Sequence, residues 1–162
     1  PTAGTVRLLG SQITSLEEDK RARIRGKDVG IVFQSFHLMP RLTALDNVML
    51  PLEISGDPQS LDKAYEALKQ VGLSNRAKHF ATQLSGGEKQ RVAIARSIVN
   101  KPKILFADEP TGNLDKKSSS SITDLIFSLN ELIQTTLVLV THDLSLAEKC
   151  DEVYELSEGQ LL

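Results

Sequence analysis

The sequence has few of the residues that stabilise secreted proteins or hold proteins in a membrane. Its 162 residues include one cysteine, Cys150, and no tryptophan. A single cysteine excludes an internal disulfide, so a secreted, disulfide-stabilised fold is excluded and a reducing compartment is expected. The apolar runs, such as residues 137–140, are far shorter than the roughly 20 residues that a membrane-spanning helix needs. Any membrane association is therefore expected to depend on a partner protein.

An excess of one charge is also absent. Lysine and arginine number 19 and aspartate and glutamate 21, which gives a net charge of -2. Such a surface has no general attraction for nucleic acid or for an anionic membrane, so no nucleic-acid partner is expected. The remaining composition, 40% hydrophobic and 25% charged, is typical of one α/β domain. The chain opens at Pro1 with a strand predicted over residues 5–9, and we therefore expect it to begin within a longer protein.

Apolar runs predict buried strands at residues 29–33, 104–107 and 137–140, and a further strand is predicted at residues 153–156. The middle two runs lack polar alternation, as expected for parallel strands covered on both faces. Strands and helices alternate, which predicts a doubly wound parallel sheet whose ligands bind at the carboxyl ends of the strands. The predicted helices cover residues 16–24, 43–50, 61–71, 85–99 and 144–150, with another of about 17 residues before residue 137.

Local signals predict where several of these helices begin and end. Ser15 and Glu18 have the spacing of a capping box at the start of the first helix. Pro51 is predicted to end the second helix, and Gly72 the third.

Two adjacent carboxylates, Asp108 and Glu109, follow the predicted strand at residues 104–107. An acidic pair at such a position is costly unless a cation or a substrate uses it. In phosphoryl transfer to water, the first carboxylate can hold Mg²⁺ and the second can polarise the attacking water. The alternative interpretation is an acidic turn in contact with solvent.

Single polar residues follow the two other strands. His142 comes after residues 137–140 and can hydrogen-bond a γ-phosphate or the attacking water, while Gln34 comes after residues 29–33 and offers an amide to a metal or to water. Taken alone, each of these residues is equally compatible with a structural role.

Ser85, Gly86 and Gly87 begin the predicted helix over residues 85–99. The exposed N–H groups of a helix N-terminus form a site for anions. An ordinary serine N-cap explains Ser85, but it does not explain two glycines, which destabilise a helix. This segment therefore favours an anion-binding role.

These segments together resemble the motifs of ABC-type ATPases. Residues 84–88, Leu-Ser-Gly-Gly-Glu, resemble the signature motif, residues 104–109 the Walker B strand with its catalytic glutamate, and residues 112–115, Gly-Asn-Leu-Asp, the D-loop. Gln34 and His142 match the Q-loop and the H-loop. The motifs occur in the order of the family, and the resemblance covers the whole chain.

The resemblance implies an α/β fold of the P-loop NTPase type, with helices on both faces of a parallel sheet. Within residues 1–162 it implies a helical subdomain over about residues 43–95, with the remainder forming a RecA-like core. No P-loop of the form Gly-x-x-x-x-Gly-Lys-Ser/Thr occurs in these residues. We therefore expect an ATPase domain truncated at its N-terminus, in which the central P-loop strand, between those at residues 137–140 and 153–156, is absent.

The family mechanism implied is a head-to-tail homodimer with two ATP molecules at its interface. ATP and Mg²⁺ are then the ligands of the parent protein, and neither is expected to bind this chain by itself because the phosphate-binding loop is missing. Ser85, Gly86 and Gly87 would contact the γ-phosphate across the dimer, and Asp115 would belong to the D-loop. Asp108 and Gln34 would bind Mg²⁺. Glu109 would polarise the attacking water, and His142 would contact the γ-phosphate.

Residues 32–40 and 42–48, with Asn113, resemble the lipoprotein-release, macrolide-export and YbbA group of bacterial ABC systems. This resemblance implies an ATPase subunit bound to an integral membrane permease at the cytoplasmic face of the inner membrane. The segment from Gln34 to Asn47 would face the permease. Its predicted apolar contact patch consists of Phe36, Leu38, Met39 and Leu42, and the alternative interpretation is that these side chains cover the local core.

Two other functional classes share these motifs with transporter subunits. ABC proteins of DNA repair insert a long coiled coil between the Q-loop and the signature, but only about 50 residues separate Gln34 from Ser85 here. ABC proteins of translation carry two cassettes in one chain, and this soluble, permease-free class remains the alternative. A third hypothesis treats the chain as a non-catalytic fragment, which is compatible with a transporter origin.

Overall fold

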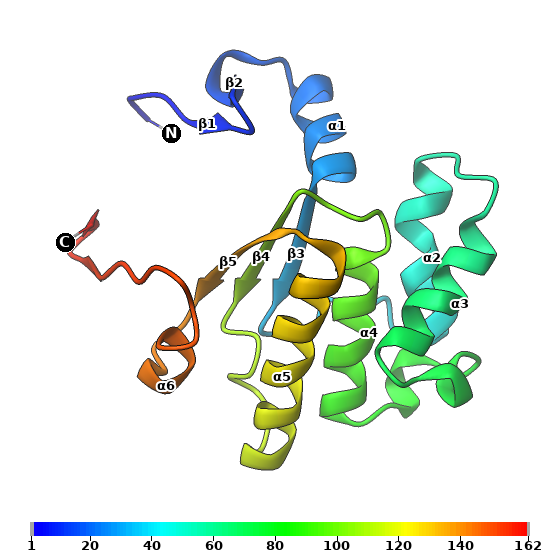
Figure 1. The fold of residues 1–162 in the computed structure, drawn as a ribbon. Helices are drawn as coiled ribbons and strands as arrows, with labels where there is room; N and C mark the ends of the chain where they lie inside the picture. Colours follow the sequence, from blue (N-terminus) through cyan, green and yellow to red (C-terminus); the bar gives the residue numbers. More distant parts are fainter. Residues whose placement is uncertain (1, 162) are drawn as a thin grey trace.

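A three-stranded parallel sheet lies within the computed structural model, which describes residues 2–161. Its strands are β3 (Val29–Phe33), β4 (Ile104–Asp108) and β5 (Thr136–Val140), in the order β3-β4-β5. Parallel pairing aligns the three strands residue by residue, so they end at one level. Figure 1 shows their carboxyl ends on the same side of the molecule. The three strands confirm the predicted runs to within one residue.

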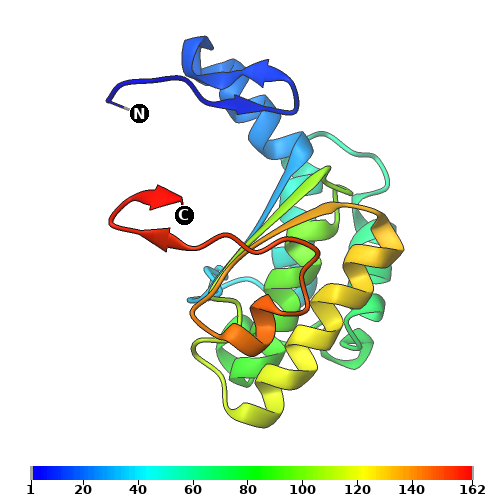
Figure 2. The same ribbon diagram turned by 60° about the vertical axis from the view of Figure 1, so that its left-hand side comes forward.

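Two long helices, α4 (Gly86–Ile98) and α5 (Lys116–Ile133), lie on one face of this sheet (Figures 1 and 2). Their apolar side chains meet the inward-facing side chains of the strands, and the contact excludes water from the core. The prediction of a buried helix over residues 85–99 is confirmed. The fully or almost fully buried residues of this layer include Val32, Val92, Ile94, Leu105, Ala107, Ile122 and Ile126.

The opposite face of the sheet is partly open among the described residues. Ile31, Phe33, Val138 and Val140 alternate with the buried or partly buried positions of β3 and β5 and keep between 36% and 54% of their surface exposed. The expectation that helices cover both faces is therefore not met within residues 2–161. The physical reason is that no described helix packs over these alternate side chains, although their apolar character is that of a covered strand.

A helical layer packs beside α4 and consists of α2 (Ala44–Ile54) and α3 (Ser60–Gln70). Thr43 caps α2 in a capping box with Asp46. The prediction that Pro51 ends this helix is wrong, because α2 continues through it. Packing explains the difference, since Leu52 is only 1% exposed and the apolar contacts of the last turn outweigh the hydrogen bond that proline removes.

The region before β3 differs from its prediction in two ways. A hairpin of β1 (Arg7–Leu8) and β2 (Ser11–Gln12) replaces the strand over residues 5–9. Leu9 and Gly10, with φ of 50° and 79°, form the two-residue turn, a combination typical of tight hairpins.

The capping box predicted from Ser15 and Glu18 is also wrong. The Ser15 hydroxyl donates to the Gln12 carbonyl at 3.2 Å, within a 3₁₀ turn, Ile13–Ser15. Helix α1 (Glu18–Asp28) therefore begins later than predicted, and its N-cap, Glu17, makes no side-chain hydrogen bond. The serine is used by the turn before the helix, which leaves it unable to cap the helix itself.

The C-terminal region forms shorter elements than the sequence predicts. Helix α6 (Leu144–Ala147) ends before residue 150, and the strand predicted at residues 153–156 does not join the sheet. Instead β6 (Leu156–Ser157) and β7 (Gln160–Leu161) pair with each other around a tight turn, and Figure 2 shows this hairpin apart from the central strands. The correction has a physical cause, because the apolar run has no neighbouring strand to pair with among the described residues. None of the described helices is long and apolar enough to span a bilayer.

Gly30 allows the close contact between β3 and α4. A Cβ atom built at Gly30 would lie 2.4 Å from the Ser97 carbonyl oxygen and 2.9 Å from Leu105 Cδ1. We expect Gly30→Ala to lower the free energy of unfolding by about 1–3 kcal/mol, because backbone atoms must move apart. Gly26→Ala is the matched control, since Gly26 lies inside α1 with open space around it and should be neutral or stabilising. Urea unfolding measures both, and equal effects would contradict the packing described.

Candidate functional site

The three strands end in register, and this brings polar residues together at one edge of the sheet. Phe33 pairs with Asp108, and Asp108 pairs with Val140, so the residues that follow each strand leave the sheet at neighbouring points. Gln34 follows β3, Glu109 follows β4, and Asp108 itself is exposed at the end of β4. The structure thus gathers the residues predicted from the strand ends along one edge of the sheet.

Glu109 and His142 are in direct contact. Glu109 Oε1 accepts a hydrogen bond from the His142 backbone N–H at 3.0 Å, and His142 Nδ1 lies 2.6 Å from the same oxygen. The Glu109 side chain is 23% exposed, while that of His142 is 85% exposed. With Nδ1 as the donor, the ring is oriented by Glu109 and its other nitrogen stays available for a ligand.

A left-handed backbone directs Glu109 toward His142. Its φ is 44°, while its N–H still donates to the Val140 carbonyl at 2.9 Å. A non-glycine residue in this region costs about 1–3 kcal/mol and persists only where its surroundings hold it there. The buried Pro110 follows directly and limits the adjacent backbone. The chain therefore stores strain at the residue to which the sequence assigns the catalytic carboxylate.

The Gln34 side chain is oriented by the loop that follows β4. Gln34 Nε2 donates to Asn113 Oδ1 at 3.4 Å, and Asn113 Nδ2 donates to the Gln34 carbonyl at 3.0 Å. A Cβ atom on Gly112 would lie 2.6 Å from Gln34 Nε2, so only glycine leaves room for this contact. Because Nε2 faces Asn113, Oε1 is the atom left to bind a cation.

The donor set suits a magnesium ion that is shared with a nucleotide. Within residues 2–161, His, Cys, Asp and Glu side chains form no group of three or more that could hold a metal by themselves. Mg²⁺ at a phosphate site needs less, because water and phosphate oxygens fill most of its positions. The Asp108 carboxylate and the Gln34 amide oxygen are hard oxygen ligands, and adjacent strands bring them to one edge of the sheet.

Ser85, Gly86 and Gly87 form the exposed start of α4. The Ser85 hydroxyl accepts from the Glu88 N–H at 3.3 Å, and Glu88 Oε2 accepts from the Ser85 N–H at 2.9 Å. Arg76 Nε donates to the other Glu88 oxygen at 2.8 Å, which lowers the pKa of the Glu88 carboxyl. The helix start is thus held by a capping box and an ion pair, and the predicted helix boundary is confirmed.

Asp115 lies next to this helix start rather than with the strand-end residues. A cavity of about 450 Å³ is lined by both Ser85 and Asp115. Asp115 caps α5 by accepting hydrogen bonds from the Ser118 hydroxyl at 2.7 Å and the Ser118 N–H at 3.0 Å, and the hydroxyl in particular lowers its pKa. Its carboxylate therefore has a structural role in addition to the predicted D-loop role.

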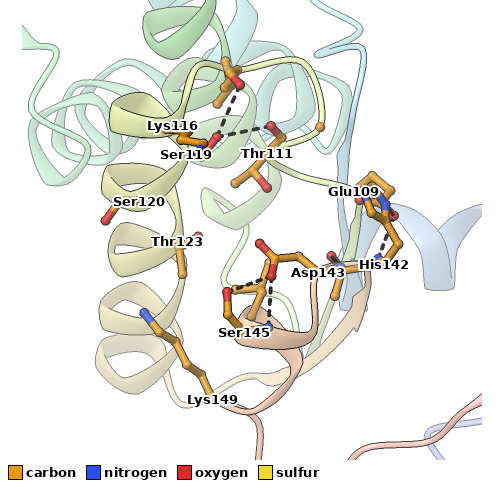
Figure 3. A pocket seen from close by; sticks show the side chains of 14 residues that line it. Glu109, Thr111, Lys116, Ser119, Ser120, Thr123, His142, Asp143, Ser145 and Lys149 are labelled. Carbon is orange, nitrogen blue, oxygen red and sulfur yellow. Dashed lines mark hydrogen bonds and ion pairs between the residues drawn. The ribbon is translucent and has the colours of Figure 1, made fainter.

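A second cavity, also about 450 Å³, lies between α5 and α6. Figure 3 shows Glu109 and His142 on one side of it and Ser120 and Thr123 of α5 on the other. Asp143 caps α6 through the Ser145 N–H and hydroxyl, at 3.0 and 2.7 Å. The cavity therefore has polar side chains on both sides, together with Leu114 and Leu146, and it reaches the Glu109–His142 pair.

Two residues of α4 that the sequence prediction missed hold the loops of this site. Gln90 is fully buried and donates to the Pro110 carbonyl at 2.6 Å. Arg96 donates to the carbonyls of Phe36 and His37, at 2.9 and 2.6 Å, and both of those residues have left-handed φ. The sequence signal for both is a polar side chain whose neighbours three and four residues along the helix, among them Val92, Ala93 and Ile94, are apolar.

The apolar patch predicted after Gln34 is smaller than expected. Met39 is 49% exposed, but Leu38 packs against the core, and Phe36 and Leu42 are half-buried. The prediction of four exposed apolar residues is therefore wrong for three of them. They cover the local core because the loop folds back over α2 and α4, where the buried Asn47 amide donates to the Met39 and Leu42 carbonyls.

Comparison with known proteins agrees with this geometry. Residues 1–112 match the family model described as ABC transporter. The chain is 50% identical to the "Uncharacterized ABC transporter ATP-binding protein YbbA" of Escherichia coli (strain K12), over 99% of this chain and 71% of that protein. The chain belongs to the ATP-binding subunits of ABC transporters. A second relative of this ABC subunit, 45% identical over 99% of this chain and 68% of that protein, is the "Lipoprotein-releasing system ATP-binding protein LolD" of Xanthomonas campestris pv. campestris (strain 8004).

Solved structures show the same fold. The ATP-binding cassette MJ0796, in a dimeric post-hydrolysis state bound to ADP and Pi, superposes with a TM-score of 0.88 at 40% identity, covering 99% of this chain and 72% of that one. A second dimeric structure of MJ0796 has a TM-score of 0.80 at 43% identity, over 91% of this chain and 66% of that one. The predicted ABC ATPase fold and the predicted likeness to the YbbA and lipoprotein-release group are confirmed.

The Glu88 capping box makes the start of α4 sensitive to acid. Because the pKa of Glu88 is lower in the folded chain than its ordinary value of 4.5, the carboxylate stabilises the folded state above that value, and the contribution is lost as the pH falls through the lower folded pKa. We expect Glu88→Gln to be less stable than the parent at pH 7, with the difference disappearing in acid. Urea unfolding from pH 7 to pH 3 tests this, with Glu131→Gln on the exposed side of α5 as the matched control. A difference that stays constant with pH would contradict the role of the carboxylate.

The left-handed backbone at Glu109 predicts a separable effect on stability. Glu109→Ala and Glu109→Gly both remove the carboxylate, but only alanine keeps a Cβ atom in the strained conformation. We expect the glycine variant to be more stable than the alanine variant by about 1 kcal/mol. Chemical denaturation of the two variants measures this difference. Equal stability would show that residue 109 does not hold a positive φ in solution.

Proposed function

We propose that this ABC subunit hydrolyses ATP at the strand-end site and couples hydrolysis to an integral membrane permease. The observation that carries the proposal is the contact of Glu109 with His142 at the edge that also holds Asp108 and Gln34. In the proposed reaction Glu109 accepts a proton from the attacking water, the water oxygen bonds to the γ-phosphorus, and the bond from that phosphorus to ADP breaks. His142 contacts the γ-phosphate. Its contacts with Glu109 also help to orient the Glu109 carboxylate.

Magnesium would be held by Asp108 and by Gln34 Oε1, where it would neutralise phosphate charge. Asn113 supports this assignment because it occupies the Gln34 amide nitrogen and turns the amide oxygen away from itself. The Asp108 carboxylate is exposed, and among the described residues it makes no ion pair. It can therefore release water and bind a phosphate-bound ion without breaking an existing contact.

The signature residues would act across a head-to-tail homodimer. Ser85 and Gly86 are exposed and Gly87 is partly exposed, and their helix N-terminus presents N–H groups and a partial positive charge to an anion. We place the γ-phosphate of the partner copy there, with Asp115 of the D-loop beside it. The dimeric MJ0796 structures support this arrangement, since this chain covers 72% of the first of them at 40% identity.

This subunit would lie at the cytoplasmic face of the membrane, with the permease against the segment that follows Gln34. Within that segment Met39 is the most exposed apolar side chain, and Arg96 fixes the backbone at Phe36 and His37. The name of LolD places that relative in a lipoprotein-releasing system, which favours a transport role over the translation-type alternative. The proposal also divides the chain into a helical subdomain over about residues 43–95 and a RecA-like core over the remainder.

Replacement of Glu109 tests the assignment of the catalytic base. Because no P-loop motif occurs in these 162 residues, we do not expect them to bind or hydrolyse ATP by themselves, and the assay uses the protein expressed from its natural gene. Glu109→Gln should retain ATP binding and lower kcat by roughly 10²- to 10⁴-fold, the usual effect of removing a positioned base. Glu131→Gln on α5 is the control for loss of one carboxylate. Unchanged turnover in Glu109→Gln would refute the proposed mechanism.

A further inference from the structure

Gln90 lies where α4 crosses the ends of β3 and β4. The side chain has no exposed surface. Its Nε2 donates to the Pro110 carbonyl at 2.6 Å and lies 3.5 Å from the Phe33 carbonyl. Both neighbours are acceptors, so the nitrogen of the amide must face them. One buried amide group therefore touches the backbone that leaves both strands.

The two carbonyls are directly next to residues of the proposed site. The Phe33 carbonyl belongs to the peptide that leads into Gln34, and the Pro110 carbonyl comes one residue after Glu109. Asn113 holds Gln34 from the other side, through its carbonyl at 3.0 Å and its side chain at 3.4 Å. Gln34 is thus held between two amide side chains, one in the core and one at the surface.

Filling this space with the Gln90 amide lowers the stability of the folded chain. Its Oε1 is buried and has no hydrogen-bond partner, and such a group costs about 1–3 kcal/mol. Methionine has a similar volume and leaves no buried polar atom of its own, so packing alone would favour it. The benefit of glutamine must therefore come from the position that its nitrogen imposes on the two carbonyls.

We propose that Gln90 and Asn113 are positioning residues that hold Gln34 in the geometry needed for magnesium and water, and that Gln90 ties this geometry to the signature helix. The proposal rests on the hydrolytic function proposed above. Because α4 starts with Ser85-Gly86-Gly87 and contains Gln90 on its second turn, one rigid helix joins the residues that meet the partner's nucleotide to the residues that meet this copy's own. A displacement of α4 therefore moves both sets of residues.

The test compares Gln90→Met and Asn113→Ala in the protein expressed from its natural gene. Each should lower kcat by about 10- to 100-fold, the usual effect of removing a partner that orients a metal ligand, while KM for MgATP stays within about twofold. Each should also weaken Mn²⁺ binding to the ATP complex of a Glu109→Gln background, measured by electron paramagnetic resonance. Asn113 is exposed, so its variant tests the proposal even where Gln90→Met fails to fold.

A double-variant experiment separates positioning from a direct role. If Gln90 and Asn113 act through Gln34, neither substitution should lower kcat further in a Gln34→Ala background. Gln70→Met, on the exposed side of α3, is the matched control for the substitution. Val48→Ala, in the buried face of α2, is the control for lost stability, and it should lower the melting temperature with kcat unchanged.

Several outcomes would overturn the proposal. It fails if folded Gln90→Met and Asn113→Ala retain kcat and Mn²⁺ affinity, if either lowers kcat equally with and without Gln34, or if Val48→Ala lowers kcat as much as they do. Failure of the hydrolytic function itself is distinguishable, because Glu109→Gln would then turn over ATP at the parent rate.

Discussion

Parallel pairing of Phe33 with Asp108 and of Asp108 with Val140 sets the ends of three strands at one level, and the arrangement of the site depends on it. A slip of one residue in either pair would turn the strands' side chains to the opposite face and move Gln34 or His142 away from Glu109. The register is in turn held by the core, because Leu105 and Ala107 of the middle strand are fully buried. Apolar packing on one face of the sheet therefore determines the position of polar groups at its edge.

Several local costs in free energy occur at that edge, although left-handed residues such as Lys101 and Gln134 also occur elsewhere. Glu109 has a left-handed backbone, as do Phe36 and His37, and Gln90 keeps a buried oxygen without a partner. The left-handed residues are held by hydrogen bonds from neighbouring elements: Arg96 donates to the carbonyls of Phe36 and His37, and the Val140 carbonyl accepts from Glu109. Such costs are tolerated at functional sites, where geometry is selected at the expense of stability.

The parts of the fold that the sequence predicts well are those governed by local pattern. The apolar runs of the three strands and the serine at the start of α4 give correct boundaries because burial and capping leave direct traces in composition. The errors arise where contacts distant in sequence decide. Pro51 stays inside α2 because Leu52 is packed, and the strand predicted at residues 153–156 finds no partner strand.

The same division applies to the site. Asp108, Glu109, Gln34 and His142 are predictable because they lie at or just after the carboxyl ends of strands that share an edge. Gln90 is not, because its role depends on which carbonyls lie opposite the second turn of α4. Asn113 was noted for its family likeness, but its contact with Gln34 requires two loops separated by 79 residues to meet.

Backbone acceptors explain how α4 can hold several loops at once. Gln90 and Arg96 both donate to carbonyl oxygens, at Pro110, Phe36 and His37, rather than to side chains. A hydrogen bond to a carbonyl depends on the position of the backbone and not on the side chain of that residue. A movement of α4 would therefore act directly on the backbone of the loops. Gly30 reinforces the connection, because the absence of a side chain there lets Ser97 approach β3 closely. Helix α4 therefore touches the chain at the start of the loop that follows β3, along β3 itself and beyond β4, and these contacts make α4 and the strand-end edge parts of one mechanical unit.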